Sequence, residues 1–300
     1  MAIRNNEDRT GERRAQASPA PVVATQAADE EGAANKTLDF TCPTEFVDLP
    51  SQGRFYAEDH PLKGVDSVEI RFMTAKDEDI LTSKSLLKKG VAIDRFLQNI
   101  IVDKAVKVQD LLIGDKNALV VAARITGYGA DYTTKVSCPA CGTSQEYEFD
   151  LEDSVVKNGG LESVAEEMPK ISESVSMAED GSWLVECPKS KVTVGLQLMN
   201  GHHEKFLAKS AAMKKKQKLP ESLLTDHLRQ IIISVNGNKE PRNINKFVDV
   251  MPAMDSRFLR SVYEKLMPNV DLTQHFECHS CGFEQEMEVP FTTDFFWSKR

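Results

Sequence analysis

Two short cysteine motifs, far apart in the sequence, constrain the fold of this chain more than any other feature. Each has the pattern Cys-x-x-Cys-Gly, and each precedes an acidic, alternating run, residues 145–149 and 285–289. Two thiolates on a tight turn between two strands, with a glycine that allows positive φ, are typical of a zinc knuckle. One knuckle supplies two ligands and structural zinc takes four, so we expect both pairs to bind one Zn²⁺. The expected ligands are Cys138, Cys141, Cys278 and Cys281.

The spacing of the cysteine pairs leaves other interpretations open. A local zinc ribbon places its pairs 15–20 residues apart, far closer than these two. Four thiols without metal are one alternative. A redox pair is another, but such a pair opens a helix, whereas strand-like alternation follows both motifs here. His275 and His279 flank the second pair and are possible substitute ligands. With four cysteine ligands, no coordination position stays open for catalysis, so we expect a structural zinc.

Composition excludes several classes of protein. The formal net charge of −9 argues against a nucleic-acid clamp, which usually shows a basic face. Six cysteines in 300 residues do not suggest a disulfide scaffold, and we expect Cys42 and Cys187 to be free buried thiols. We find no apolar stretch long enough to span a bilayer and no secretion signal. These features predict folding in a reducing cytoplasm.

The first half of the chain alternates strand and helix patterns. Residues 1–37 have almost no large apolar side chains, which predicts a disordered arm. A first α+β unit is expected at residues 38–150. It is predicted to hold a strand at 68–72, a helix capped by Thr74 that runs to Gly90, a helix with one apolar face over 93–101, a third helix from Gly114 to near Gly127, and a strand at 132–136 before the first cysteine turn.

The same order is expected again after an acidic connector, residues 151–190, which ends in a strand at 183–185. The second unit, 191–300, is predicted to hold a strand at 192–198, a helix at 204–213, a helix with an apolar face over 224–235, and a third helix capped by Asp255. An interval of 140 residues separates Asp115, Leu119, Cys138 and Cys141 from Asp255, Leu259, Cys278 and Cys281.

This constant interval predicts an internal duplication. The expected fold class is α+β, with two pseudo-repeats (strand, three helices, zinc-knuckle β-hairpin) joined at a shared zinc site of four cysteines. The alternative is two unrelated α+β halves. A pseudo-two-fold relation between the copies would bring equivalent hairpins together, each with half of a tetrahedral site.

Little in the sequence suggests catalysis. Neither of the usual glycine-rich phosphate loops is found, nor a Gly-x-Ser-x-Gly elbow. His202-His203-Glu204 is a possible metal or base site, although solvent exposure explains it more simply. The cationic run 213–218 is a candidate contact for an acidic partner or a solvated helix end. We therefore expect no enzyme.

Four features, taken in order, resemble a known family. They are Leu49-Pro-Ser-Gln-Gly-Arg-Phe-Tyr56, Met73-Thr-Ala-Lys-Asp-Glu-Asp-Ile-Leu81, the two cysteine hairpins and Phe295-Phe-Trp297. Together they are similar to the baseplate hub proteins of T-even-like, contractile-tailed bacteriophages. The resemblance covers residues 44–150 and the C-terminal hairpin and tail. It implies a protein of tail baseplate assembly without enzymatic activity.

The expected function is therefore that of a non-enzymatic phage tail protein, stabilised by zinc and acting in baseplate or hub assembly. Expected partners are other tail and baseplate proteins; no small-molecule substrate, membrane or nucleic acid is expected. The expected location is the host cytoplasm during assembly, or the baseplate of the virion. A zinc-ribbon nucleic-acid-binding regulator is the alternative, and a metalloenzyme is a third hypothesis. Candidate partner-binding residues are Leu49, Phe55, Tyr56, Phe295, Phe296 and Trp297.

Overall fold

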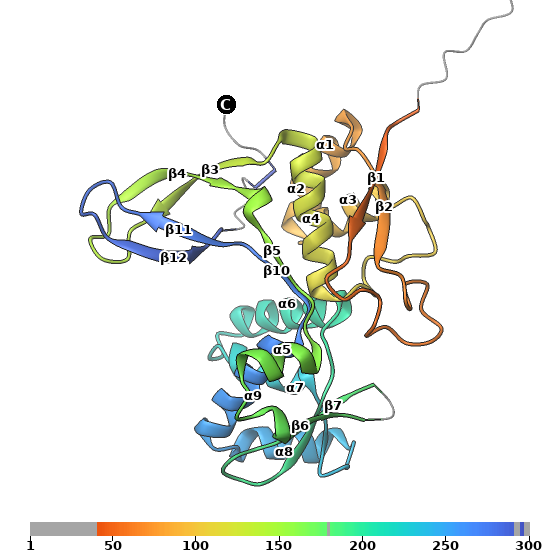
Figure 1. Cartoon of the computed structure of the whole chain (residues 1–300), viewed down its shortest axis with the longest axis vertical. Coiled ribbons are helices and arrows are strands. Elements are labelled where there is room, and N and C mark those ends of the chain that lie inside the picture. Colours follow the sequence, from red (N-terminus) through yellow and green to blue (C-terminus); the bar gives the residue numbers. More distant parts are fainter. Residues whose placement is uncertain (1–40, 179–180, 291–294, 297–300) are drawn as a thin grey trace, which may run out of the picture. The chain divides into compact units, whose positions relative to one another are not determined.

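The structure is a computed structural model, and it describes residues 41–178, 181–290 and 295–296. The predicted arm, residues 1–37, lies outside the described residues, as does Trp297. Strands and helices come in separate runs along the described chain and every strand pair is antiparallel, which confirms the α+β class (Figure 1).

The first half begins with an antiparallel hairpin and ends with another. Between them lie four helices, where three were expected. The elements are β1 (Thr44–Asp48), β2 (Ser67–Arg71), α1 (Ala75–Thr82), α2 (Lys84–Lys88), α3 (Ala92–Ile100), α4 (Ile113–Tyr128), β3 (Asp131–Ser137) and β4 (Ser144–Asp150). β1 pairs with β2 and β3 pairs with β4, both antiparallel.

Local sequence explains most of these boundaries. Thr74 and Asp77 form a capping box at the start of α1, as the Thr74 cap predicted. The helix expected to continue from there to Gly90 breaks at Ser83, whose backbone is extended, so it becomes α1 and α2. In α3 the predicted apolar face is buried through Phe96, Leu97 and Ile100.

The acidic stretch 151–190 contributes regular structure to both halves. Its elements are a 3₁₀ turn (Leu151–Asp153), β5 (Val155–Lys157), α5 (Gly160–Glu167), a second 3₁₀ turn (Ser172–Ser174), β6 (Val175–Met177) and β7 (Trp183–Glu186). β5 pairs with a strand near the C-terminus, and β6 and β7 belong to the main sheet of the second half. Whether 151–190 separates two domains stays a prediction.

The second half is built on a four-stranded antiparallel sheet in the order β6-β7-β8-β9. Its remaining elements are β8 (Thr193–Leu196), α6 (Gly201–Lys216), α7 (Leu223–Ile231), β9 (Ile232–Val235), α8 (Pro241–Val250), α9 (Ala253–Leu266), β10 (Asn269–Asp271), β11 (Thr273–Glu277) and β12 (Glu284–Glu288). Here too four helices are present where three were expected, and α8 is the additional one.

Two boundaries in this half differ from expectation. The apolar face over 224–235 was expected to be one helix, but the helix ends at Ile231 and residues 232–235 form β9 beside β8. Three of the four β9 residues are β-branched, which favours a strand once a sheet edge is available. Asp255 was expected to cap the third helix, but α9 begins two residues earlier and Pro252 is its N-cap.

The described chain has two hydrophobic cores. The first is formed by β1, β2, α1, α3, α4 and the two cysteine hairpins, and it includes residues from the C-terminal end such as Phe276, Val289 and Phe296. The second is formed by α5, the four-stranded sheet and α7 to α9. The chain therefore leaves the first core after β4, builds the second, and returns to the first through β10, which pairs with β5.

Candidate metal centre

The two cysteine turns have the same backbone geometry. In the first, the Cys138 amide donates to the Thr143 carbonyl at 2.9 Å, and the Gly142 amide donates to the Cys138 carbonyl at 2.9 Å. In the second, the Cys278 amide donates to the Phe283 carbonyl at 2.9 Å, and the Gly282 amide to the Cys278 carbonyl at 2.8 Å. Both glycines have positive φ, 73° and 65°, so each turn needs its glycine.

The fold brings the four cysteine sulfurs to one place. Cys138 Sγ lies 3.8 Å from Cys281 Sγ, and Cys141 Sγ lies 3.8 Å from Cys278 Sγ. All four sulfurs lie within 4.8 Å of one another. Sulfurs bound tetrahedrally to zinc at about 2.3 Å would be about 3.8 Å apart, so the arrangement fits a structural zinc ion.

Burial and ionisation of the thiols also suit a cation. Cys138 and Cys278 are buried, whereas Cys141 and Cys281 are exposed at the turn tips. Hydrogen bonds with Thr143 lower the pKa of Cys141 to about 6. A hydrogen bond from the Phe283 amide would lower the pKa of Cys281. Hydrogen bonds between the Cys281 thiol and the other cysteines, Cys141 first, instead raise that pKa to about 12. If more than one of these thiols ionises, the neighbouring thiolates repel one another, and a bound divalent cation would neutralise that repulsion.

Contacts below the cysteines hold the two hairpins against each other (Figure 1). The Tyr147 hydroxyl of β4 donates to the His275 carbonyl of β11 at 3.0 Å. The Gln145 amide group donates to the Glu277 carbonyl at 3.0 Å and accepts from the His279 amide at 3.0 Å. The Tyr147 ring lies 5.1 Å from the buried Phe276 ring. The pairing of hairpins is thus specified by side chains as well as by the cysteines.

Neither flanking histidine joins the cysteine cluster. His275 and His279 are both exposed, and the potential metal-ligand group among the described residues contains only the four cysteines. The His275 imidazole lies 3.9 Å from Glu286 instead.

Two candidate partner-binding residues of the 49–56 stretch are buried. Leu49 and Tyr56 lie in the first core. The Tyr56 hydroxyl donates to Asp115 at 2.7 Å and accepts from the Leu112 amide at 3.1 Å. Phe55 is half-buried, with its ring 5.6 Å from that of Trp183. This stretch therefore ties the β1–β2 loop to the start of α4.

The described aromatic residues of the tail also pack inside the chain. Phe295 lies against Tyr132 at 5.1 Å and Phe296 against Phe96 at 5.3 Å, measured between ring centroids. The buried Arg124 guanidinium donates to the Phe295 carbonyl at 2.8 Å. An aromatic tail of this kind either packs on its own core or docks on a neighbouring subunit, and Phe295 and Phe296 pack on the first core of the same chain.

The His202-His203-Glu204 triplet has local structural roles. His203 and Asn200 form the capping box of α6. Glu204 accepts from Lys116 at 2.7 Å, and His202 lies 2.8 Å from Asp110. These contacts account for all three side chains without a metal.

Comparison with known proteins then identifies the family. The sequence model of the family described as T4 bacteriophage base plate protein matches residues 43–297. The chain belongs to this baseplate protein family. The match confirms the resemblance noted from the sequence, and it extends through the acidic stretch that the resemblance left out. Searches of curated proteins and of solved structures found no significant match. Among the described residues of this baseplate-family chain, every helix is too short or too polar to cross a membrane.

Proposed function

We propose that this chain is a non-enzymatic structural protein of the phage tail, which acts in baseplate hub assembly or structure through protein–protein contacts. Family membership over residues 43–297 carries the proposal. The partners are other tail and baseplate proteins, and the protein acts in the host cytoplasm during assembly and as part of the tail.

A structural zinc ion at the four cysteines is the second part of the proposal. The sulfur spacing supports it, because two cysteine pairs far apart in the sequence lie at the separation that tetrahedral zinc requires. Four thiolates fill the coordination sphere, so the ion would hold the hairpins together and leave no position for a substrate.

The fold is best explained as two pseudo-repeats. Both halves contain a hairpin, helices, a long helix and a cysteine hairpin in the same order. Asp115 in α4 and Asp255 in α9, which are 140 residues apart, occupy the third position of their helices. Each accepts a hydrogen bond from a backbone amide just after a Pro: Ser51 follows Pro50, and Lys189 follows Pro188. The second half then differs by the added elements β9 and α8.

Partner contacts are proposed to involve the 49–56 loop and the aromatic tail. Because Leu49, Tyr56, Phe295 and Phe296 are buried, they would act by fixing the shape of these segments. Phe55 is only half-buried, and the Arg54 guanidinium lies 5.2 Å from the centroid of its ring. Trp297 completes the proposed set but lies outside the described residues.

The proposed function is tested by binding to individually purified tail proteins of the same phage. We expect the full chain, purified with stoichiometric zinc, to bind at least one of them. A chain that binds none of them would contradict the proposal. Binding of duplex DNA with an affinity that falls steeply with salt would favour the nucleic-acid regulator instead.

Zinc is tested in the same preparations by metal analysis. We expect one zinc per chain in the wild type and in Cys42→Ser, whose half-buried thiol lies outside the cluster. In Cys278→Ser zinc should be lost. Folded wild-type protein without bound metal would contradict the zinc assignment and leave the baseplate role standing.

A further inference from the structure

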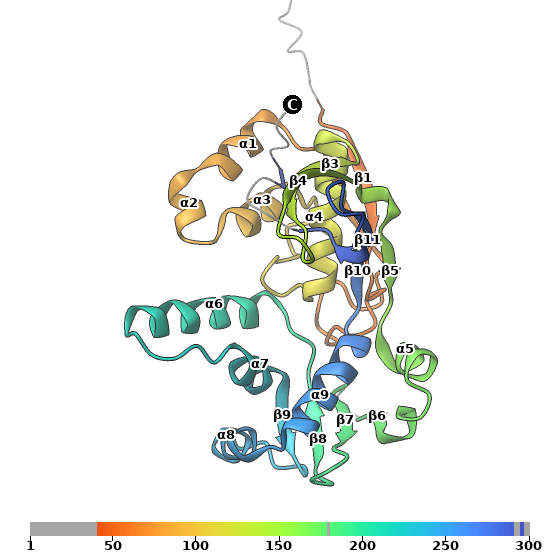
Figure 2. The same ribbon diagram turned by 90° about the vertical axis from the view of Figure 1, so that its left-hand side faces the viewer.

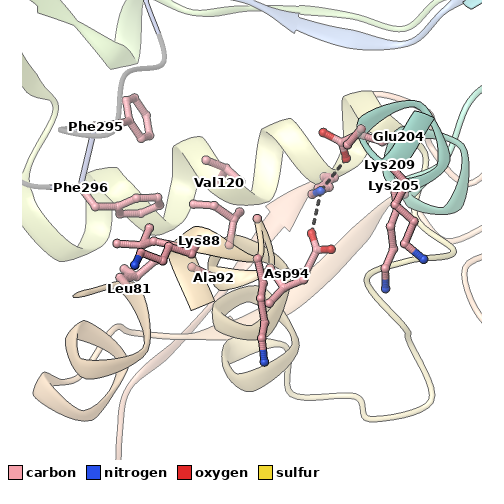
Figure 3. Close-up of a pocket in the computed structure, with 18 of the residues that line it drawn as sticks. Leu81, Lys88, Ala92, Asp94, Val120, Glu204, Lys205, Lys209, Phe295 and Phe296 are labelled. Carbon is pink, nitrogen blue, oxygen red and sulfur yellow. Dashed lines mark hydrogen bonds and ion pairs between the residues drawn. The ribbon is translucent and has the colours of Figure 1, made fainter. Parts of the chain in front are cut away.

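A groove lies between α3 and α6, with α4 as its floor (Figure 3). In Figure 2, α6 and the α2–α3 segment project to the same side of the chain, one below the other. The groove encloses about 830 Å³. Leu81, Val120, Phe295 and Phe296 line one end with apolar surface, and Ala208 and Ala212 line the α6 wall.

A buried lysine connects the two walls beneath this groove. Lys116 of α4 is only 8% exposed, and its Nζ lies 2.7 Å from Asp94 of α3 and 2.7 Å from Glu204 of α6. Burial would lower the pKa of Lys116, but the hydrogen bonds to these two carboxylates raise it instead. Lys116 thus stays charged and holds α3 and α6 at a fixed separation.

The groove is cationic although the chain is acidic. Five lysines and two carboxylates line it, a net charge of +3, whereas the whole chain carries −9. Lys116 forms ion pairs with both carboxylates, Asp94 and Glu204. The other four, Lys88, Lys89, Lys205 and Lys209, make no ion pair with any carboxylate of the described residues. They form two cationic rims, one at the C-terminal end of α2 and one on α6, on either side of a groove whose larger apolar residues gather at one end.

We propose that this groove binds an acidic amphipathic helix of a partner protein of the baseplate. A groove between two helical walls suits a third helix, whose apolar stripe packs on the apolar end of the groove and on Ala208 and Ala212, and whose flanking carboxylates meet the two lysine rims. Ala208 and Ala212 lie one helical turn apart, so they allow the incoming helix to approach α6 closely. The inference rests on the proposed function and names the chemistry of one contact.

A direct test uses two synthetic helical peptides of about 18 residues, with the same leucine stripe but flanked by either glutamate or lysine. Fluorescence anisotropy with the full chain should show binding of the glutamate peptide at least tenfold tighter than the lysine peptide, and weaker binding at higher salt. Equal binding of both peptides, or of neither, would overturn the proposal.

Variants of α6 then locate the contact. The pair Lys205→Glu and Lys209→Glu should weaken the glutamate peptide at least tenfold. The matched pair Lys215→Glu and Lys216→Glu, with the same charge change on the same helix but outside the groove, should change binding less than twofold. Equal effects of both pairs would show non-specific attraction. Ala208→Trp, at an exposed position, should block the groove without changing charge.

Binding of Ala208→Trp to the tail proteins that bind the wild-type chain tests the groove separately from the proposed function. Loss of one of these partners in Ala208→Trp supports the groove as its site. Unchanged binding of all of them overturns the groove and leaves the baseplate role intact. Self-association of the wild type that Ala208→Trp abolishes would instead assign the groove to a second copy of this chain.

Discussion

Three buried aspartates occupy the same position in three helices. Asp77, Asp115 and Asp255 are each the third residue of α1, α4 and α9, and each is 0% exposed. At this position a carboxylate lies near the positive end of the helix dipole. Asp77 also accepts from the Thr74 amide just before its helix, whereas Asp115 and Asp255 accept from amides of loops distant in the sequence. Burial alone would raise the pKa of each, and the donors decide the outcome. The Arg71 guanidinium holds the pKa of Asp77 below its usual range, and two backbone amides do the same for Asp255. The donors to Asp115, Ser51 and Tyr56, are neutral, and the pKa of Asp115 stays raised.

Asp77 is expected to contribute most to stability among these carboxylates. It accepts from Arg71 at 2.6 and 2.8 Å and from Asn99 at 2.6 Å. Asp77→Asn should lower the free energy of unfolding by about 2–4 kcal/mol at pH 7, because it leaves a largely buried guanidinium without its counter-charge. Denaturant unfolding measures this, with Asp79→Asn on the exposed face of α1 as the control.

The same pair predicts a pH dependence. Because the folded-state pKa of Asp77 is depressed, its stabilisation is complete above the unfolded value of 3.8 and is lost as the pH falls below it. The stability difference between wild type and Asp77→Asn should therefore shrink between pH 5 and the acid limit of folding. A difference that stays constant across this range would refute the assignment.

Tyr56 is predicted to act through its hydroxyl. Tyr56→Phe removes one buried donor to Asp115 and one acceptor for the Leu112 amide, so we expect a loss of about 1–3 kcal/mol in unfolding free energy. In Tyr128→Phe, whose hydroxyl bonds to the exposed Glu78, the loss should stay below about 0.5 kcal/mol. Thermal and denaturant unfolding of both variants measure these losses. Equal losses of unfolding free energy would mean that the buried hydrogen bonds of Tyr56 contribute no more to stability than the exposed one of Tyr128.

At the scale of elements, periodicity and capping predicted most of the fold. The apolar spacing of α3, the Thr74 cap and the alternation of β3 can be recognised from neighbouring residues alone. Residues 232–235 could not be placed in this way, because their strand state depends on pairing with β8, a tertiary contact. The cysteine cluster was predictable since two equal motifs each supply half of a site. The lysine-rimmed groove was not, because its walls come from different halves of the chain.

Metal removal should loosen the two cysteine hairpins and spare the main sheet. Each hairpin has only two strands and is marginal alone. After treatment with a zinc chelator, we expect amide hydrogen exchange to increase in 131–150 and 273–288 and to stay nearly unchanged in 183–196. Lower pH should favour metal loss, since thiolates must be deprotonated to bind zinc. Unchanged exchange in both hairpins would show that side-chain contacts alone hold them.

At the scale of the whole described region, the two cores are joined through close backbone contacts. Ile113 donates to the Met199 carbonyl at 3.1 Å, and Leu112 and Asn200 form a bridge between the starts of α4 and α6. β5 and β10 pair beside this junction, with Lys157 and Asp271 2.6 Å apart. Sequence patterns within one element carry no information about such contacts, so the junction became visible only in the structure.

Gly114 is the residue on which this junction depends most directly. A Cβ at this position would lie 2.6 Å from the carbonyl carbon of Pro268 and 2.8 Å from Asn269 Cα, both backbone atoms that cannot rotate away. Gly114→Ala should therefore lower the free energy of unfolding by about 1–3 kcal/mol, despite the better helix propensity of alanine. Gly127→Ala in the same helix is the matched control, since its Cβ meets only the flexible end of Met73. That control should be neutral or slightly more stable. If both variants unfold like the wild type, the α4–β10 contact is looser than the structure shows, and the return of the chain to its first core rests on the cysteine hairpins instead.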